Sequence, residues 1–352
     1  MHMADALLSP AVGGAMLAVS GATAAYCARK VREDFDQSKV PLMGVLGAFI
    51  FASQMLNFTI PGTGSSGHLG GGLILAILLG PEAAFLVMAS VLTVQALFFA
   101  DGGLLALGSN MFNLGFFPAF VAYPLVYKLI VGARHTRGRV TTGSLVAALV
   151  GLQLGALGVV LETTMSGVSE LPFGTFVMMM LPIHLGIGVV EGLATAAVAL
   201  FVMRARPEIL DGAATGDRLG RVSLRPILIG LAVCAVLGGA VFSWFASTNP
   251  DGLEWSMAKA AGTEEVAGVT GPIHDSSASI QKKTAVMPGY GSKNGAGATG
   301  STGASGSAGT GSTVDVGRSS AGILGAGLTL AIALAIGFAL KLRASSRANP
   351  GV

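Results

Sequence analysis

Long apolar runs constrain this chain more than any other feature of its sequence. Nine stretches of mostly apolar residues are separated by short polar or charged segments. A helix that crosses the hydrocarbon core of a bilayer needs about 20 apolar residues, and most of the runs approach that length. The run 69–80 is short for a crossing, and the alternative is a re-entrant pair with 82–100. We expect spanning helices at about 11–29, 40–58, 69–80, 82–100, 109–131, 142–162, 174–203, 226–246 and 321–340.

The composition agrees with a membrane location. Only 11% of the 352 residues are charged and 52% are hydrophobic, whereas soluble domains contain about 25% charged residues. Most of the surface must therefore face a medium other than water, and the lipid bilayer is that medium. The predicted fold class is an all-α polytopic membrane protein, with a seven-helix substrate-binding bundle plus two additional transmembrane helices. The net charge of +3 is too small to indicate a nucleic-acid partner.

The basic residues are distributed unevenly across the expected spans. With nine crossings, sixteen of the 21 Lys and Arg residues fall on one side of the membrane. The positive-inside rule makes that side cytoplasmic. We therefore expect the N-terminus outside and the C-terminus inside, in the cell membrane of a prokaryote. The other side carries, in one long loop, Lys259, Lys282, Lys283, Lys293 and Arg318.

The order of the runs divides the chain into two units. Residues 1–206 hold seven expected spans joined by short loops, and a cytoplasmic connector at 207–225 follows. Residues 226–352 form a two-span accessory unit with an external loop at about 247–320. The second half of that loop is rich in Gly, Ser, Ala and Thr, so we expect a flexible coil there without a fold. The two cysteines lie inside spans, so no disulfide framework is expected.

Small residues form one face of the first expected span. They recur at spacings of four and three, which places them on one side of a helix. Such a stripe lets another helix approach closely. Internal packing and contact with a separate membrane subunit explain the stripe equally well. The residues are Ala11, Ala15, Ala18, Ala22 and Ala25.

The first two residues form a candidate metal chelator. No cleavable signal peptide is visible, and a His at the second position leaves the initiator Met in place, so a free α-amine is expected at Met1. The Met1 amine, the His2 backbone nitrogen and His2 Nδ1 close two fused chelate rings, which present three nitrogens in one plane. Square-planar nitrogen coordination favours Ni(II) or Cu(II).

His68 is the candidate for the fourth nitrogen. It lies in the segment PGTGSSGHLGGG (61–72), in a loop that the expected topology places on the same side as Met1. Neutral imidazole is a suitable ligand for nickel or cobalt, and the surrounding glycines allow another chain segment to come close. The residues therefore predict a Ni(II) or Co(II) site made by Met1, His2 and His68.

Three segments resemble the substrate-specific component of cobalt/nickel energy-coupling factor (ECF) transporters of the CbiM/NikM type. A fourth segment, PDGLEW (250–255), resembles the small accessory component that is fused to such proteins or encoded beside them. Together the two resemblances cover the whole chain. The three segments are MHMADALLSP (1–10), SGHLGGGLILAILLGPEAAFLVMASVLTVQALFFADGGLLALGSNMFN (66–113) and HLGIGVVEGLAT (184–195).

The resemblance implies a ligand set and partners. Met1, His2 and His68 match the positions that coordinate the metal in this family. A separate membrane coupling subunit and a cytoplasmic ATPase would drive transport. In agreement, the chain has no G-x-x-x-x-G-K-[ST] phosphate loop and is not expected to be an enzyme. One departure is that Ala6 follows Asp5 where the family has Gly, which removes no ligand.

Polar residues near the ends of the expected spans have two explanations. Polar groups in a span usually face the bundle or a site, so they form either a second shell that orients the imidazoles and the loop or plain interhelical hydrogen bonds. These residues are Gln54, Asn57, Ser66, Asn110 and Asn113.

His184 and Glu191 are seven residues apart and therefore share one helical face. They predict a buried structural pair, with a proton-linked pair or a metal exit path as the alternative. His135 and His274 fall in expected loops and are given no role.

Two rival functions remain at this level. Gly64–Gly67 reads Gly-Ser-Ser-Gly, the G-x-S-G pattern of intramembrane serine proteases, with Ser66 as nucleophile and His184 as base. The expected place of Ser66, in a loop outside the membrane, disfavours this reading. A stand-alone ion-coupled transporter or channel is expected to contain inverted repeats with broken helices, and the sequence shows no repeat.

Overall fold

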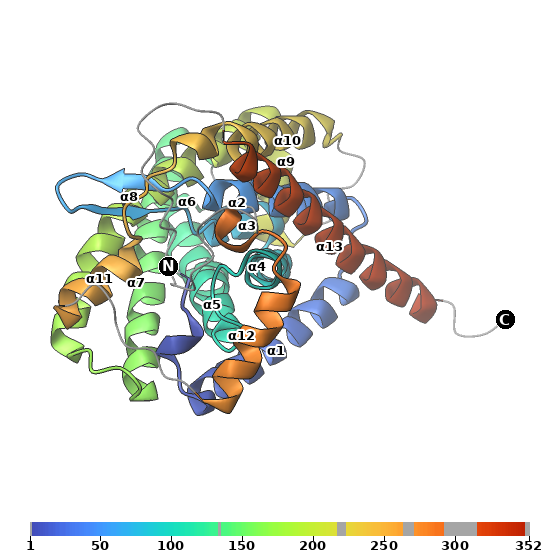
Figure 1. Ribbon diagram of the computed structural model, residues 1–352. Helices are drawn as coiled ribbons and strands as arrows, with labels where there is room; N and C mark the ends of the chain where they lie inside the picture. Colours follow the sequence, from blue (N-terminus) through green and yellow to red (C-terminus); the bar gives the residue numbers. More distant parts are fainter. Residues whose placement is uncertain (1, 133–134, 217–222, 263–270, 292–314, 349–352) are drawn as a thin grey trace.

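A computed structural model describes residues 2–132, 135–216, 223–262, 271–291 and 315–348, with side chains described up to residue 343. The described part is almost entirely helical, as the apolar runs predict (Figure 1). A two-stranded antiparallel hairpin, β1 (Phe58–Ile60) and β2 (Ser65–Gly67), is its one sheet.

The helices follow the expected runs closely. The N-terminal region contains η1 (Asp5–Leu7), α1 (Pro10–Glu33), α2 (Lys39–Gln54), α3 (Gly72–Leu79), α4 (Pro81–Val94), η2 (Gln95–Phe99), α5 (Leu107–Met111), η3 (Phe112–Tyr127), α6 (Lys128–Val131), α7 (Arg137–Ser166), α8 (Phe173–Ala205) and α9 (Pro207–Thr215). The C-terminal segment, defined as the described residues from 223 onward, contains α10 (Arg225–Ala240), η4 (Phe242–Phe245), α11 (Gly252–Ala261), α12 (Pro272–Thr284), η5 (Pro288–Tyr290) and α13 (Val316–Ala348).

Six helical segments of the described chain are long and apolar enough to cross a membrane. They are Pro10–Glu33, Pro81–Phe99, Leu107–Val131, Arg137–Ser166, Phe173–Ala205 and Val316–Arg343. Two further apolar helices, α2 and α10, have 16 residues each, which is short for a crossing. The protein is therefore a multi-pass membrane protein, and the count of nine crossings remains a prediction.

The segment α3 does not match a full crossing. Its eight residues rise only about 12 Å, against about 30 Å for the hydrocarbon core. All eight are buried, so its backbone ends are covered by protein, as a broken helix requires at membrane depth. Gly80, with φ +85°, and Pro81 turn the chain directly into α4. This hairpin agrees with the re-entrant alternative.

The fifth expected span, 109–131, is built mainly from π-helix, η3. Pro118 and Pro124 lie inside η3. A proline has no N–H to donate and its ring displaces the carbonyl of the preceding turn, so the helix widens to longer hydrogen-bonded rings.

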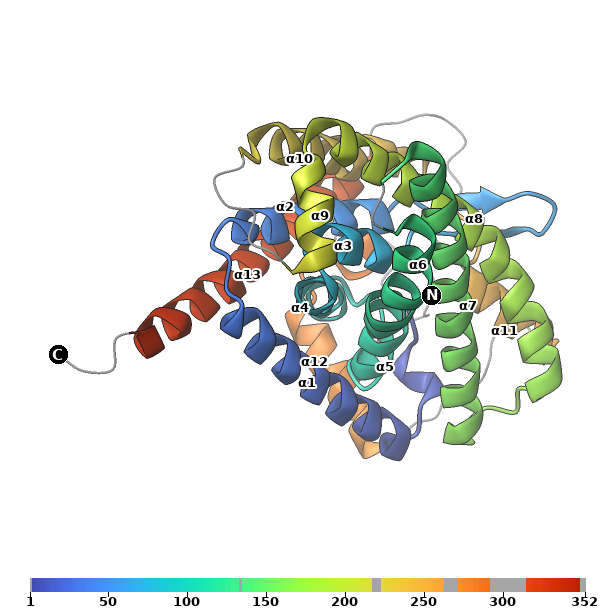
Figure 2. The same ribbon diagram turned by 180° about the vertical axis from the view of Figure 1, so that it is seen from behind.

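The apolar helix α4 lies at the centre of the bundle. Figures 1 and 2 show α4 end-on in the middle, and 72% of the hydrophobic window of Pro81–Phe99 is buried. A helix that is apolar all round is stable when protein surrounds it. By contrast, only 17% of the corresponding window of α1 is buried. The five alanines of the predicted stripe on α1 are all exposed, so the stripe does not pack inside the described chain.

The first half of the expected external loop is folded. It contains α11, α12 and η5, which lie against the N-terminal region beside α8 and η2. The sequence analysis predicted no structure for this half, although local start signals are present: Asp251 and Glu254 form a capping box, and Pro272 opens α12. Residues 292–314, which hold most of the predicted coil, lie outside the described residues.

Two of the C-terminal helices, α10 and α13, cross each other at a pair of glycines. The backbones of Gly239 in α10 and Gly322 in α13 touch, and a Cβ added at Gly239 would lie 3.1 Å from the Cα of Gly322. Small residues at a helix crossing are what allows this approach. Figure 2 shows α13 continuing past the crossing, away from the bundle and toward the C-terminus.

We predict that Gly322→Leu separates α10 from α13 and lowers stability by about 1–3 kcal/mol, the cost of overpacking a tight contact. The measurement is the thermal unfolding midpoint of the detergent-solubilised protein. Gly327→Leu is the matched control on the same helix, because nothing lies within 4 Å of a Cβ added there. Equal midpoints for the two variants would contradict the proposed crossing.

Candidate metal site

The first described residues of the chain lie inside the helical bundle. Met3 is fully buried, and Asn110 of α5 holds its backbone on both sides. Met3 N–H donates to Asn110 Oδ1 at 2.8 Å, and Asn110 Nδ2 donates to Met3 O at 3.2 Å. Gly103 N–H also donates to Met3 O, at 2.9 Å. Because Met3 is fixed in this way, the neighbouring His2 is held at a defined place inside the protein.

His2 and His68 lie face to face. Their ring centroids are 5.0 Å apart and their planes differ by 10°. Both are nearly buried, with 7% of the His2 side chain and 8% of His68 exposed. The sequence analysis predicted that these two histidines meet although 65 residues separate them, and the structure brings them together. Met1, the third predicted ligand residue, lies outside the described residues.

His68 is set up to act as a neutral ligand. Its Nδ1 lies 3.0 Å from the carbonyl oxygen of Leu69. A carbonyl can only accept, so Nδ1 carries the proton and Nε2 carries the lone pair. Burial lowers the pKa of His68 to about 3, so the imidazole is neutral at every pH above that value.

Asp101 is the main functional residue that sequence reasoning missed. His2 Nδ1 lies 3.1 Å from Asp101 Oδ1, and Tyr290 donates its hydroxyl to Asp101 Oδ2 at 2.5 Å. Burial alone would raise the pKa of Asp101, but the facing His2 and the Tyr290 hydroxyl outweigh it and hold that pKa below its ordinary value. The available signal was a lone acidic residue between two apolar runs, in FADGG (99–103). The predicted chelate through His2 Nδ1 therefore requires the ring to leave Asp101.

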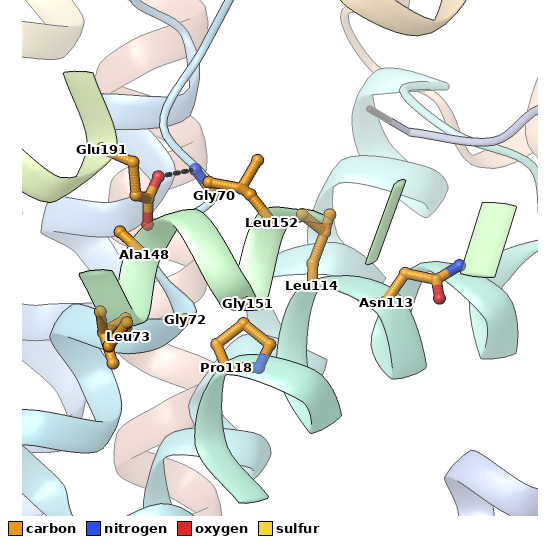
Figure 3. Close-up of a pocket in the computed structure, with 11 residues that line it drawn as sticks. Gly70, Gly72, Leu73, Asn113, Leu114, Pro118, Ala148, Gly151, Leu152 and Glu191 are labelled. Atoms are coloured by element: carbon orange, nitrogen blue, oxygen red, sulfur yellow. Dashed lines mark hydrogen bonds between the residues drawn. The ribbon is translucent and has the colours of Figure 1, made fainter. Parts of the chain in front are cut away.

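The loop after His68 is held by two buried side chains. Glu191 of α8 accepts the N–H of Gly70 at 2.5 Å (Figure 3). It also accepts the N–H of Gly71 at 2.9 Å. Gln54 Nε2 donates to Gly70 O at 2.7 Å, and Gln95 Nε2 donates to Gln54 Oε1 at 2.8 Å. Gln54 thus holds the loop, which is the role predicted for it, while Gln95 was missed.

The predicted pairing of His184 with Glu191 is wrong. His184 Nδ1 lies 2.8 Å from Met180 O, while the carboxylate of Glu191 is occupied by the loop. Seven residues along a helix separate two side chains by about 10 Å along its axis, so a shared face does not mean contact. The two residues instead have different partners: His184 bonds to its own helix, and Glu191 binds the loop after His68.

The remaining polar residues of the predicted second shell bind elsewhere. Asn113 Nδ2 donates to Glu162 Oε2 at 2.9 Å, and Asn57 O accepts the N–H of Ser247 at 2.8 Å. Ser66 donates its hydroxyl to Asn249 O at 2.8 Å. The Ser66–His184 pair required by the protease alternative is therefore not formed in the described structure.

The PDGLE sequence of the C-terminal segment docks on the strand that leads to His68. Ser66 N–H donates to Pro250 O at 2.8 Å, and Ser66 forms a parallel bridge with Asp251. Asp251 Oδ1 then caps α11 by accepting from the backbone of Glu254 at 2.9 Å. Trp255 Nε1 donates to Thr63 O at 2.9 Å. Each contact uses a backbone group of the hairpin, so the segment covers it closely.

A second part of the C-terminal segment covers the chain start. His274 of α12 is buried, and its Nε2 lies 2.9 Å from Leu8 O. Gln281 Nε2 donates to Gly102 O at 2.8 Å, and Tyr290 reaches Asp101 as described. His274 was expected in a loop without a role, so this expectation is wrong. It lies on a helix that the Gly-poor sequence 272–284 forms from Pro272 onward.

The described side chains alone do not make a metal site. Within the described ranges, no three His, Cys, Asp or Glu side chains are grouped so that they could hold a metal ion. The two parallel imidazoles must therefore be completed by other donors, and the backbone and α-amine at the chain start are the predicted ones. A small cavity lies beyond Glu191 and is lined by Gly70, Gly72 and Asn113 among others (Figure 3).

This fold and this site define a multi-pass membrane protein with a buried pair of stacked histidines, His2 and His68. The chain belongs to the family described as the cobalt uptake substrate-specific transmembrane region (CbiM), whose model matches residues 2–209. The PDGLE domain matches residues 225–342. The two matches correspond to the predicted fusion of a substrate-specific component with an accessory component.

Relatives and solved structures agree with the family. A protein of Haloquadratum walsbyi named as a metal transport protein is 37% identical over 212 residues, covering 60% of this chain and 93% of the relative. A protein of Archaeoglobus fulgidus named as a fused nickel transport protein, NikMN, is 38% identical over 223 residues, 62% of this chain and 71% of the relative. A crystal structure of a truncated transition metal transporter matches with a TM-score of 0.52 and 32% identity, covering 58% of this chain and 99% of that one.

We predict that Glu191→Gln loosens the loop that carries His68. Glutamine can accept only one of the two glycine N–H groups, and the loss of a hydrogen bond to a charged group costs about 1.5–3 kcal/mol. The measurement is backbone hydrogen exchange of residues 69–73, which should become faster. The control is Glu170→Gln, since Glu170 is exposed; unchanged protection in Glu191→Gln would contradict the assigned role.

Proposed function

We propose that this protein is the substrate-binding membrane subunit of an ATP-driven uptake transporter for Ni(II) or Co(II). The ion is captured at the external face by nitrogen ligands from Met1, His2 and His68. The core then reorients against a membrane coupling subunit, while a separate cytoplasmic ATPase hydrolyses ATP. The transported ion is the substrate, not a resident cofactor.

The observation that carries the proposal is the stacked pair His2–His68. Two imidazoles are held parallel and away from water, beside a chain segment whose backbone is bound at Met3 by Asn110. Imidazole is a borderline ligand that suits nickel and cobalt. A planar set of nitrogen ligands requires donors that lie close together in fixed positions. The hydrogen bonds from Asn110 to Met3 fix the segment that carries His2, and those to Glu191 fix the loop that carries His68.

The choice of ion follows from the ligand chemistry and from the relatives. The family description names cobalt uptake, and the Archaeoglobus fulgidus relative is named for nickel transport. A flat set of four nitrogens favours Ni(II) over ions that prefer oxygen ligands, such as Mg(II). We therefore propose nickel as the preferred ion and cobalt as the second.

The exposed stripe on α1 supports a partner in the membrane. The five stripe alanines, Ala11 to Ala25, are exposed, and together with the glycines beside them they give a smooth helix surface. Small residues offer little packing surface to lipid tails, whereas they allow the backbone of a partner helix to approach closely. We propose this surface as the contact with the coupling subunit.

The C-terminal segment is proposed to close the site. It binds the hairpin before His68 through Pro250 and Trp255. It also binds Gly102 and Asp101, next to His2, through Gln281 and Tyr290. These contacts lie on two sides of the histidine pair, so the segment can keep His2 and His68 covered while an ion is bound. Displacement of the segment would expose the two histidines to solvent.

We predict that a chain with one extra residue before Met1, or with His68→Gln, loses nickel binding. The extension displaces the α-amine and the substitution removes an imidazole. Loss of second-shell groups alone lowers metal affinity by about 10–100-fold, so loss of a ligand should exceed that range. The measurement is nickel stoichiometry of the purified full chain by equilibrium dialysis and metal analysis.

The control for this measurement is His135→Gln. His135 lies 2.9 Å from Asp211, at the end of the bundle where α9 packs, so its loss leaves the histidine pair untouched. Full nickel binding by both the extended chain and His68→Gln would refute the proposed capture site.

A further inference from the structure

A cavity of about 220 Å³ lies far from the two stacked histidines. It is lined by the last turns of the helical segment Leu107–Val131, whose first turns carry Asn110, the residue that binds Met3. The helices α3 and α9, which lie side by side in Figure 2, contribute Ile77 and Leu210 to its wall. One water needs only about 10–15 Å³, so the cavity has room for part of a larger ligand.

A tyrosine hydroxyl in the wall of this cavity has no partner. Tyr127 lines the cavity and only 4% of it is exposed. Its Oη is buried, and no group in the described part of the chain forms a hydrogen bond with it. Buried polar groups in proteins are almost always hydrogen-bonded. The phenol can donate its proton, so it indicates an acceptor that is bound in the cavity.

Two basic side chains lie at the rim of the cavity. Lys128 lines it and donates one N–H to Ala214 O at 2.8 Å, and a lysine has three N–H groups. Arg139 Nη1 donates to Val131 O at 3.3 Å. A Cβ added at Gly132, which also lines the cavity, would lie 3.3 Å from the same Arg139 nitrogen. Two positive charges therefore lie close to the unpartnered hydroxyl.

The charge of the wall favours an anionic ligand. Among the described residues that line the cavity, none is acidic. The nearby carboxylate of Asp211 binds His135, whose Nδ1 lies 2.9 Å from Asp211 Oδ1. Ammonium and guanidinium groups form their strongest hydrogen bonds with carboxylates and phosphates. An ammonium, a guanidinium and a hydroxyl that surround one cavity are thus suited to a phosphate group.

The position of the cavity along the helix indicates where the phosphate comes from. Leu107–Val131 is long and apolar enough to cross a membrane, so its last turns, which carry Tyr127 and Lys128, lie near the level of the lipid head groups. Leu125 and Leu129 are 61% and 76% exposed, so an apolar surface adjoins the cavity. Basic pockets between spanning helices on the cytoplasmic side bind anionic head groups, and the basic residues predict that side here.

We propose that this cavity binds the phosphate group of an anionic phospholipid. Tyr127 Oη and Lys128 Nζ donate to the phosphate, Arg139 lies at the rim, and the acyl chains lie along Leu125 and Leu129. The inference is independent of the proposed capture of nickel or cobalt, because none of these residues takes part in it.

The experiment is native mass spectrometry of the detergent-purified full chain, titrated with phosphatidylglycerol, with phosphatidylcholine and with inorganic phosphate. Each basic residue near a membrane surface strengthens the binding of anionic lipid about fivefold. The unmodified protein should therefore bind one phosphatidylglycerol about tenfold more tightly than phosphatidylcholine. An excess of inorganic phosphate should not displace this lipid, because it has no acyl chains.

Two substitutions test the donors, and each has a matched control. Tyr127→Phe removes one hydroxyl and should weaken phosphatidylglycerol binding at least about tenfold, the effect of a lost hydrogen bond to a charged group. Its control is Tyr26→Phe, since Tyr26 is exposed on α1. Lys128→Gln should weaken binding about fivefold. Its control is Arg137→Gln, which removes an exposed positive charge at the same end of the bundle.

Several results would overturn the proposal. Unchanged affinity in Tyr127→Phe would mean that the hydroxyl faces only water. Equal losses in Lys128→Gln and Arg137→Gln would mean that surface charge alone attracts the lipid. Equal binding of the two lipids would refute the preference for an anionic one, and displacement by inorganic phosphate would assign the cavity to a free anion.

Lys128→Gln also removes the hydrogen bond to Ala214 of α9, so this variant can fail to fold. Arg139→Gln then takes its place and should weaken binding about fivefold. Unchanged affinity in Arg139→Gln would refute the assigned rim. Tyr127→Phe removes only a hydroxyl without a partner, so its unfolding midpoint should equal that of the unmodified protein.

Discussion

The burial of the chain start is the constraint on which the rest of the structure depends. A buried backbone must have its polar groups satisfied, and a chain end inside a membrane bundle has no regular helix or sheet to do this. Asn110 supplies both a donor and an acceptor to Met3. The turn at Gly102 is part of the same solution: its φ of +80° and its closeness to Asn110 leave no place for a side chain.

The second half of the site is built by the same principle. The loop after His68 is too rich in glycine to hold itself, because glycine loses more conformational freedom on ordering than any other residue. Glu191 and Gln54 compensate by binding the backbone of Gly70 and Gly71 directly. The two histidines thus meet because two unrelated segments are each fixed to the helical bundle. Neither segment positions the other.

The PDGLE sequence illustrates how one short motif can satisfy several requirements. Pro250 presents its carbonyl to Ser66, Asp251 and Glu254 start α11, and Gly252 leaves room for His184. The C-terminal segment therefore covers the histidine pair with its backbone at Pro250 and with side chains such as Trp255, Gln281 and Tyr290.

Periodicity and run length predicted the helices well, because a spanning helix needs a length of apolar sequence that few other structures contain. The same argument left α3 open between a crossing and a re-entrant segment, since burial by protein can replace burial by lipid. The His2–His68 pair was predictable from ligand chemistry and from the family resemblance. The contact between Asp101 and Tyr290 could not be predicted from the sequence. The two residues are 189 positions apart, and local sequence patterns carry no information about contacts between such distant positions. His184 and Glu191 were found on one face, but Glu191 binds a loop whose course the sequence does not define, and His184 bonds to Met180 of its own helix.

The central claim is that a divalent ion is held in a flat set of nitrogens at the chain start. X-ray absorption at the nickel K-edge of the loaded protein tests it most directly. The account predicts a four-coordinate, square-planar spectrum with nitrogen neighbours that include imidazole, from a diamagnetic ion. A six-coordinate, oxygen-rich spectrum from a paramagnetic ion would contradict it.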